Sequence, residues 1–493
     1  MKIRIVLRKA VLVIMVCLLA VAVIMGTIGN LSHKSYLISL VIAAAFFLVF
    51  YESKKRSSIL LEKVFKAHTA AKICLFLSIL CLLVNGLWVF CFRPLQAADY
   101  QTFFRTAVDL SNGADLLQKD YLALFPHILG YSAFLSLFLR VFGQHVMVAA
   151  ILNVVLTTGS GVLLFVLSLK WAKKTTAVLV YCLWIVCPSK LLYNTMTLSE
   201  PYYTFLLLAF LAILSFSFDL KPEKKIKEEN NRRWIAILPL GGLAGIVIAL
   251  VNTARPIGII PFFALCLWLM FLTDINWLKD NKLFFLLFVG ATFIVYAASG
   301  YIWRGYITEK LDQLPPSVPG YSVYVGFNPQ TLGTYDDEDM ALLQDRYFGD
   351  YERNAEATQQ SMLEDAKLRI QDNKRILPSL MLHKLCVLLG HDEGGAFYSK
   401  ESMTETAYSV WCLISNIWYY CVCISSVLGC IVLWNHNCGR DTVWLLLLCA
   451  IGIILAQLLV EVAARYHYSL IPMLLLLSSF GLQDSSTLKT KLA

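Results

Sequence analysis

A few acidic and basic residues stand at the ends of long apolar blocks. Asp99 follows one block and begins an amphipathic stretch, Glu200 lies between two blocks, and Arg255 and Arg465 each follow the end of another. Ionisable groups that face lipid are costly, so those kept near a membrane often mark functional sites. Hardly any charge lies near the centre of a block. Because ion-coupled transporters keep ionisable groups at mid-membrane, this pattern favours chemistry at one membrane surface.

The types of these residues indicate two kinds of chemistry. A carboxylate such as Asp99 can accept a proton from an incoming hydroxyl or amine, although an Asp that only caps a helix gives the same pattern. Arg255, in VNTARPIG, and Arg465, in EVAARYHYSLIP, have the paired donors that suit a phosphate. Each Arg is equally explained by an interaction with lipid headgroups or with a neighbour such as Glu461.

Two other acidic features are weaker signals. Glu200, in YNTMTLSEPYYTF, precedes Pro201 and also reads as an ordinary helix start. The acidic run 336–339 lacks the spacing of a calcium loop, so a helix start that favours negative charge explains it better. We therefore predict no metal ligand and no firm cofactor, and the need for a divalent metal is left open.

The composition indicates what must position these residues. Of the 493 residues 58% are hydrophobic and 15% are charged, against about a quarter charged in soluble chains. The apolar residues form blocks of about 17–25 residues, the length that crosses a bilayer as a helix. The sequence thus predicts an all-α polytopic membrane protein. The predicted spans are 11–28, 36–51, 73–92, 146–169, 175–192, 199–218, 235–252, 256–273, 283–303, 408–433, 442–460 and 466–482.

Basic residues predict the orientation of these spans, because cytoplasmic loops are rich in Lys and Arg. With both termini inside, loop 52–72 and the cluster 221–233 face the cytoplasm, as do Lys489 and Lys491. This holds only if the apolar segment 121–142 does not cross. We therefore expect that segment to be an interfacial or re-entrant helix.

The chain divides into four predicted regions. Residues 1–72 form two N-terminal spans, and 73–303 form a transmembrane core with a first outer loop at 93–145. Residues 304–407 form an extracytoplasmic segment, and 408–493 hold the last spans. Within the outer segment we predict a helix over 337–373, capped by Asp336 or Asp337, and an amphipathic helix at 376–390 on the membrane surface.

The order of these motifs resembles a known family. AADY in the first outer loop is followed by FPHILGY, SEP, ARP and finally ARYHYSLIPMLLLL. This set, over about 73–482, is similar to the membrane glycosyltransferases of the GT-C superfamily, nearest the family 39 type that includes protein O-mannosyltransferases and aminoarabinose transferases. The spans within 1–72 lie outside the resemblance. Two departures concern the acceptor: Tyr100 follows Asp99 where members often have Glu, and Glu200 stands where several have Asp.

The resemblance implies a GT-C-like bundle of 11–13 transmembrane helices. It also implies inverting transfer of a sugar from a polyprenyl-phosphate donor to a lipid, glycan or protein acceptor on the extracytoplasmic face, with little or no need for metal. Asp99 would be the catalytic base. The residues expected to bind substrate are Tyr100, His127, Glu200, Arg255, Arg465 and His467.

Other functions remain open at this point. A flippase, polymerase or exporter of polyprenyl-linked glycans would also need about twelve spans and basic residues, but no base at Asp99. A non-catalytic protein that binds partners through 304–407 is the third reading. The net charge of +9 does not favour nucleic acid, because the basic residues lie in short loops between apolar blocks. The cysteine-rich spans favour a bacterial plasma membrane.

Overall fold

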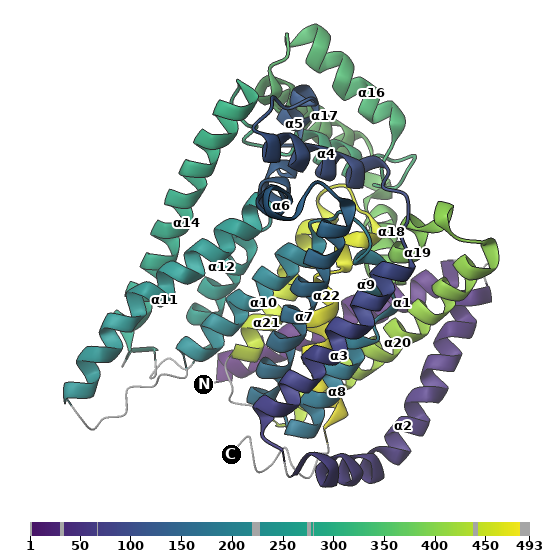
Figure 1. The fold of residues 1–493 in the computed structure, drawn as a ribbon, viewed down its shortest axis with the longest axis vertical. Helices are drawn as coiled ribbons and strands as arrows, with labels where there is room; N and C mark the ends of the chain where they lie inside the picture. The colour runs from purple at the N-terminus through teal and green to yellow at the C-terminus, as the bar shows by residue number, and fades with distance from the viewer. Residues whose placement is uncertain are drawn as a thin grey trace.

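A computed structural model describes residues 2–29, 34–66, 68–218, 227–273, 278–279, 281–436 and 442–483. Throughout these ranges the regular structure is helical, without a strand (Figure 1). The predicted all-α polytopic membrane architecture is confirmed. Among the described residues, seven helices are long and apolar enough to cross a membrane. They are α1 (Lys2–Gly29), α3 (Ala70–Cys91), α7 (Val146–Trp171), α10 (Glu200–Ser217), α11 (Lys227–Ala254), α14 (Lys282–Leu311) and α20 (Glu405–His436).

The other five predicted spans are helical but shorter in their apolar part. They correspond to α2 (Lys34–Lys66), α8 (Lys174–Ile185), α12 (Ile259–Leu267) with the π-helical turn η1 (Trp268–Leu272), α21 (Thr442–Leu458) and α22 (Leu470–Leu482). The prediction of one unbroken span at 175–192 is wrong. Pro188 lacks the N–H that would continue the helix, so α8 ends and the short α9 (Pro188–Tyr193) begins.

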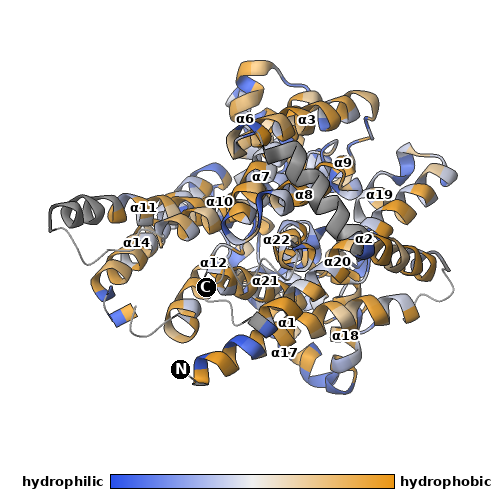
Figure 2. Cartoon of the chain, turned by 90° about the horizontal axis from the view of Figure 1, so that it is seen from below, coloured by the Kyte–Doolittle hydropathy of each residue, from blue (hydrophilic) through white to orange (hydrophobic). Residues whose placement is uncertain are grey.

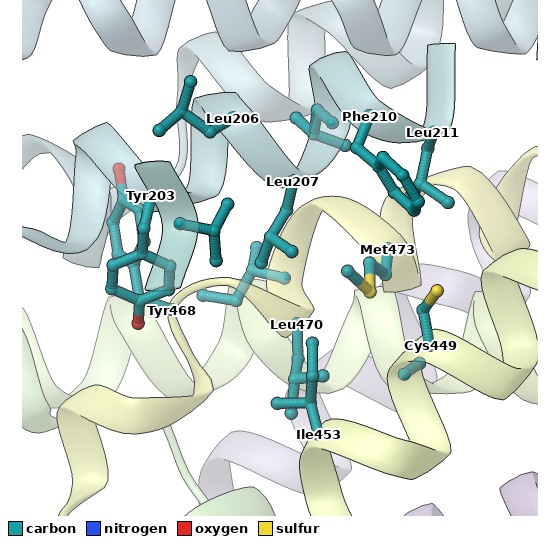
Figure 3. Close-up of a cluster of buried hydrophobic side chains, with 14 of the residues drawn as sticks. Tyr203, Leu206, Leu207, Phe210, Leu211, Cys449, Ile453, Tyr468, Leu470 and Met473 are labelled. Carbon is teal, nitrogen blue, oxygen red and sulfur yellow. The ribbon is translucent and has the colours of Figure 1, made fainter. Parts of the chain in front are cut away.

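The core of the molecule surrounds α22, whose residues are all buried. Figure 3 shows α10 side chains such as Leu207 and Phe210 against Met473 of α22 and Cys449 of α21. On another face of α22, small residues bring α20 close: a Cβ on Gly429 would lie 2.1 Å from a carbonyl oxygen of α22. Since lipid offers no hydrophobic drive between helices, such close backbone packing stabilises the bundle.

The outer faces of the bundle are apolar (Figure 2). Large hydrophobic side chains point outward with more than half of their surface exposed, among them Leu87 of α3 and Ile294 and Ile302 of α14. A continuous apolar exterior of this extent is what a lipid-facing surface requires.

The predicted interfacial segment 121–142 forms two helices. They are α5 (Lys119–Leu124) and α6 (Ile128–Phe142), separated by Phe125, Pro126 and His127. Both lie at one end of the bundle beside α4 (Ala98–Asn112), at the top of Figure 1. The interfacial or re-entrant position of this segment stays a prediction.

The segment 304–407 is helical as well. Its helices are α15 (Gly320–Gly326), α16 (Asp337–Asp345) with π-turn η2 (Arg346–Asp350), α17 (Ala355–Asp372), η3 (Lys374–Ile376), α18 (Leu377–Leu389), α19 (Gly394–Tyr398) and η4 (Lys400–Ser402). Asp336 caps α16 as predicted, accepting from the N–H of Glu338. The single helix predicted over 337–373 is wrong, because Glu352 and Arg353 adopt left-handed φ values of 46° and 65° and break it.

Part of the topology prediction cannot be compared with the fold. Lys489, Lys491 and residues 221–226 of the basic cluster lie outside the described residues. The loop predicted at 52–72 is largely helix, because α2 continues to Lys66.

Candidate active site

Asp99 lies in the first turn of α4, at the end of the bundle that also carries α5 and α6. The irregular segment before α4 is fixed by Gln96, whose amide donates to Thr195 O (3.1 Å) and accepts from Thr197 N (2.9 Å). Ala98 adopts a φ of 47°, which is rare for a residue with a Cβ. Such strain persists only where surrounding contacts impose it. The chain is therefore held in a defined path immediately before Asp99.

Arg465 meets Asp99 from the opposite end of the sequence. It belongs to the 3₁₀ turn η5 (Ala464–His467) between α21 and α22. The irregular segment leading into this turn is held by the outer segment: Glu461 N donates to Ser322 O (2.7 Å) and Val462 N to Gly333 O (2.9 Å). Arg465 Nη2 then donates to Asp99 Oδ2.

Glu200 joins Arg465 to the second arginine. Its Oε1 accepts from Arg255 Nη2 at 2.8 Å and lies 3.8 Å from Arg465 Nε. Glu200 opens α10, and Arg255 directly follows the last residue of α11. The four side chains thus form a row of alternating charge, Asp99–Arg465–Glu200–Arg255, which we call the charged row.

Burial distinguishes the two carboxylates of the charged row. The Glu200 side chain is 0% exposed, whereas that of Asp99 is 33% exposed. A substrate can reach Asp99 directly, but Glu200 only through a rearrangement. This difference favours Asp99 as the reacting carboxylate and gives Glu200 the position of a spacer between two guanidinium groups.

The protonation state of Asp99 is set by opposing effects. Burial raises the pKa of Asp99, whereas the charges of Arg465 and Arg255 and the hydrogen bond from Arg465 lower it. The lowering effects are together larger than the effect of burial, so the pKa of Asp99 lies below the ordinary value. Asp99 is therefore an ionised carboxylate at neutral pH.

His127, in the break between α5 and α6, interacts electrostatically with Arg255, Asp99 and Arg465 of the charged row. Burial and the positive charge of Arg255 lower the pKa of His127 to about 3. The imidazole is therefore neutral at physiological pH, and it can offer one donor and one acceptor to a substrate.

Aromatic rings cover the charged row. The guanidinium carbons of Arg255 and Arg465 lie 5.1 and 5.6 Å from the ring centre of Tyr466, and that of Arg465 lies 5.4 Å from the ring of Tyr398. Tyr100 is buried and meets Tyr398 edge to face at 5.7 Å. Rings in this position hold a guanidinium in place without consuming its N–H donors.

His467 is separated from the charged row although it shares η5 with Arg465. Its Nε2 lies 2.9 Å from Asp392 Oδ1, and both side chains are almost completely buried. The fold thus brings Asp99, Glu200, Arg255 and Arg465 into one row with His127 and Tyr100 beside it, whereas His467 contacts Asp392 instead.

Some atoms of the charged row lack partners. Arg255 Nε, Arg465 Nε and Glu200 Oε2 are buried and make no hydrogen bond within the described part of the chain. Buried donors of this kind are unfavourable unless a ligand or water satisfies them. Two neighbouring guanidinium groups with unused donors suit an oxyanion such as phosphate.

The predicted residue set omits several side chains at this site. Tyr466 directly follows Arg465 in the motif ARYHY, so the sequence could have placed it at the site. Tyr398 lies in GGAFYSK, where no neighbouring residue indicates a place at the site. Glu461 is the third carboxyl near the row, and burial raises its pKa. Glu461 therefore takes up a proton more readily than Asp99.

The acidic run 336–339 lies in the outer segment and has structural contacts. Asp336 caps α16, and Asp339 forms an ion pair with Arg369 at 2.9 Å. Among the described residues no group of three or more His, Cys, Asp or Glu side chains has the arrangement to hold a metal ion. The absence of metal ligands stays a prediction.

No family model and no curated protein matches the sequence. Among solved structures, the chain is similar to the archaeal oligosaccharyltransferase AglB from Archaeoglobus fulgidus in complex with an inhibitory peptide and a dolichol-phosphate, with a TM-score of 0.48 and 14% identity over 85% of this chain and 50% of that one. The A. fulgidus oligosaccharyltransferase tethered to an acceptor peptide with an NVT sequon gives a TM-score of 0.46 at 12% identity, with the same coverage. Its complex with Zn and sulfate gives 0.37 at 11%, over 84% of this chain and 53% of that one. The chain spans about half the length of these structures.

Proposed function

We propose that this chain is a membrane glycosyltransferase that moves a sugar from a polyprenyl-phosphate donor to an acceptor on the extracytoplasmic side of the membrane, with inversion at the anomeric carbon. The observation that carries the proposal is the charged row. It places one reachable carboxylate, Asp99, beside two guanidinium groups that retain unused donors. Such a pairing of base and oxyanion holder is what transfer from a phosphate leaving group requires.

Asp99 is proposed as the general base. It takes the proton of the acceptor hydroxyl or amine as that atom bonds to the anomeric carbon. The bond between the anomeric carbon and the phosphate oxygen breaks, and its electron pair leaves with the lipid phosphate. Attack opposite to the leaving group inverts the anomeric centre.

Arg255 and Arg465 are proposed to hold the lipid phosphate. As the bond to the sugar breaks, negative charge grows on the phosphate oxygens, and fixed guanidinium groups stabilise that charge without reorganising. Tyr466 keeps both groups in place. Glu200, buried between them, offsets the repulsion of the two positive charges.

The pairing of Arg465 with Asp99 suggests how the base becomes active. In the free protein the hydrogen bond from Arg465 keeps Asp99 ionised but lowers its basicity. A phosphate that binds Arg465 competes for the same donors and weakens this bond. The carboxylate would then become more basic once the donor is bound, so that it can take the proton of the acceptor.

The surrounding elements fit an amphiphilic donor. Its polyprenyl chain can remain in the bilayer along α11 and α14, which pack together, while its phosphate reaches Arg255 directly after α11. The segment 304–407 would cover the site, since backbone hydrogen bonds to Ser322 and Gly333 hold the irregular segment before Arg465. We propose a lipid, glycan or protein as the acceptor, and a plasma membrane with both termini cytoplasmic as the location of the chain.

The decisive experiment measures transfer of radiolabelled sugar from polyprenyl-phosphate donors by purified wild-type and Asp99→Asn protein. Activity in the wild type and its loss in the variant, with donor binding intact, supports the proposal. Donor binding without any transfer by the wild type would instead favour a flippase or exporter. Equal transfer by both proteins would remove Asp99 as the base, and a parallel assay with EDTA tests the need for a metal.

A further inference from the structure

A second polar cluster lies behind the charged row, and its members are buried. Asp392 is 0% exposed and uses both carboxylate oxygens: Oδ1 lies 2.9 Å from His467 Nε2, and Oδ2 accepts from Ser189 Oγ at 2.6 Å. Its N–H donates to Asn416 Oδ1 at 2.9 Å. An ionisable group with this degree of burial is costly unless each of its atoms is bonded.

The cluster has no access to a substrate. His467 is 1% exposed and its ring stacks on Tyr419 with a centroid separation of 5.5 Å. Asp392 lies between Ser189 and His467, so the Ser189 hydroxyl contacts the carboxylate and not the imidazole, unlike the serine of a nucleophilic triad. Neither residue is therefore suited to contact a substrate itself.

The cluster does, however, reach the charged row through the backbone. His467 and Arg465 are two residues apart in the same short turn, η5, and the N–H of Tyr468 donates to Arg465 O at 3.1 Å. On the other side, α19, which follows Asp392 directly, carries Tyr398 over the guanidinium of Arg465. A shift of His467 would thus move Arg465 relative to Asp99.

The segment that carries Asp392 is itself held by the two N-terminal helices. A Cβ on Gly26 of α1 would lie 3.2 Å from Gly390 Cα, so the two backbones are in close contact. Tyr36 of α2 donates to Glu393 Oε2 at 2.8 Å, and Asn416 Nδ2 donates to Glu393 Oε1 at 2.8 Å. The helices α1 and α2, which lie outside the family resemblance, therefore pack against the segment that carries Asp392.

We propose that Asp392 and His467 are positioning residues, which fix the turn Ala464–His467 so that Arg465 meets both Asp99 and the lipid phosphate. The phosphate part of this inference rests on the proposed function, whereas the effect on the Arg465–Asp99 pair does not. A displacement of about 1 Å at a reacting group can reduce the rate by about 10²-fold, so a buried anchor behind Arg465 has catalytic consequences.

Two measurements on Asp392→Ala test the inference. An electron cryomicroscopy structure of the variant is expected to show Arg465 displaced from Asp99. Titration with farnesyl phosphate is expected to show affinity lower by about tenfold or more, the loss expected when a charge-assisted phosphate contact is misplaced. Asp392→Asn, whose amide oxygen can still accept from His467, should restore most of the affinity.

Controls separate positioning from a general loss of stability. Tyr181→Phe removes a buried hydroxyl that bonds to Ser78 at 3.1 Å, far from η5 in the sequence, and it should leave farnesyl phosphate affinity unchanged. If Asp392→Ala does not fold, Asp392→Glu retains the charge and pushes His467 outward by one methylene. In an Arg465→Lys background, the Asp392 substitution should cause no further loss of affinity.

The outcomes are distinct. Arg465 still bonded to Asp99 in the Asp392 variant, or an undiminished farnesyl phosphate affinity, would overturn the inference. If wild-type protein binds no farnesyl phosphate, the proposed function fails, while the structure of the variant still decides whether Asp392 positions Arg465.

Discussion

Arg465 donates a hydrogen bond to Asp99 although 366 positions separate the two residues in the chain. Asp99 belongs to the first turn of α4, and Arg465 belongs to η5, the turn before α22. Their contact brings the proposed base and a proposed phosphate-binding residue together. An Asp that only capped a helix, or an Arg that only faced lipid headgroups, would not make this contact. The next residues of the row, Glu200 and Arg255, extend the cluster by a second ion pair.

Asp99→Asn is expected to reduce sugar transfer by about 10²–10⁴-fold, because an amide cannot accept the acceptor's proton. The same change frees Arg465 from its carboxylate partner, so farnesyl phosphate should bind at least as tightly as to the wild type. Transfer assays and titration of the purified proteins check both effects. Asp115→Asn, a fully exposed residue in the same loop, is the matched control and should behave as wild type.

Glu200→Gln is expected to destabilise the protein by about 3–5 kcal/mol, the typical cost of removing one partner of a buried ion pair. The reason is that Arg255 would lose its 2.8 Å carboxylate partner, and Arg465 a negative charge 3.8 Å away. Thermal unfolding in detergent measures the change. Glu364→Gln, on the exposed face of α17, supplies the control; equal melting temperatures for the two variants would contradict a spacer role for Glu200.

Gly130→Ala is expected to disturb the site through the backbone. A Cβ at Gly130 of α6 would lie 2.1 Å from the carbonyl oxygen of Thr253 in α11, so the two helices must separate. His127 and Arg255 flank this contact and would move apart. We expect lower farnesyl phosphate affinity and a lower melting temperature, whereas Gly290→Ala, in an open part of α14, should change neither. Unaltered affinity in Gly130→Ala would mean that this helix contact does not set the site.

Lys384 of α18 gives a prediction for pH. Burial lowers the pKa of Lys384 to about 7, and its Nζ donates to Gly326 O at 2.8 Å. Between about pH 7 and the ordinary lysine pKa of 10.5, the unfolded chain binds a proton that the folded chain does not, so this residue makes stability rise with pH. We expect the melting temperature of wild type relative to Lys384→Met to increase from about pH 6 to about pH 9, by the equivalent of about 2–3 kcal/mol. A difference that stays constant with pH would show that the lysine is charged in the folded protein.

Much of the candidate site could be predicted from the sequence, because its charged residues lie at the ends of apolar blocks. A block of about twenty apolar residues must cross the membrane as a helix, and its ends must then lie at a surface. Asp99, Glu200, Arg255 and Arg465 were predicted on one face by this argument together with the basic residues of the loops, which predict the orientation of the spans. The sequence analysis expected a single helix over 121–142, whereas the structure divides this segment into α5 and α6.

Other features had no local signal. The role of His467 is set by Asp392, and Tyr398 reaches Arg465 only because α19 folds back against η5. The break in the predicted helix 337–373 depends on left-handed residues that are not glycines, Glu352 and Arg353. Ridge-and-groove packing and the path of the outer segment select such contacts, and neither leaves a periodic pattern in the chain.

The sequence by itself thus determined the membrane class, the approximate positions of the helices and the residues able to do chemistry, because these follow from hydropathy, charge and residue type. Only the tertiary structure decided which of these residues touch. It paired Asp99 with Arg465 and buried Glu200, and it moved His467 into a separate cluster. The physical reason is that pairing between distant segments depends on how whole helices pack, a property that the composition of no single segment records.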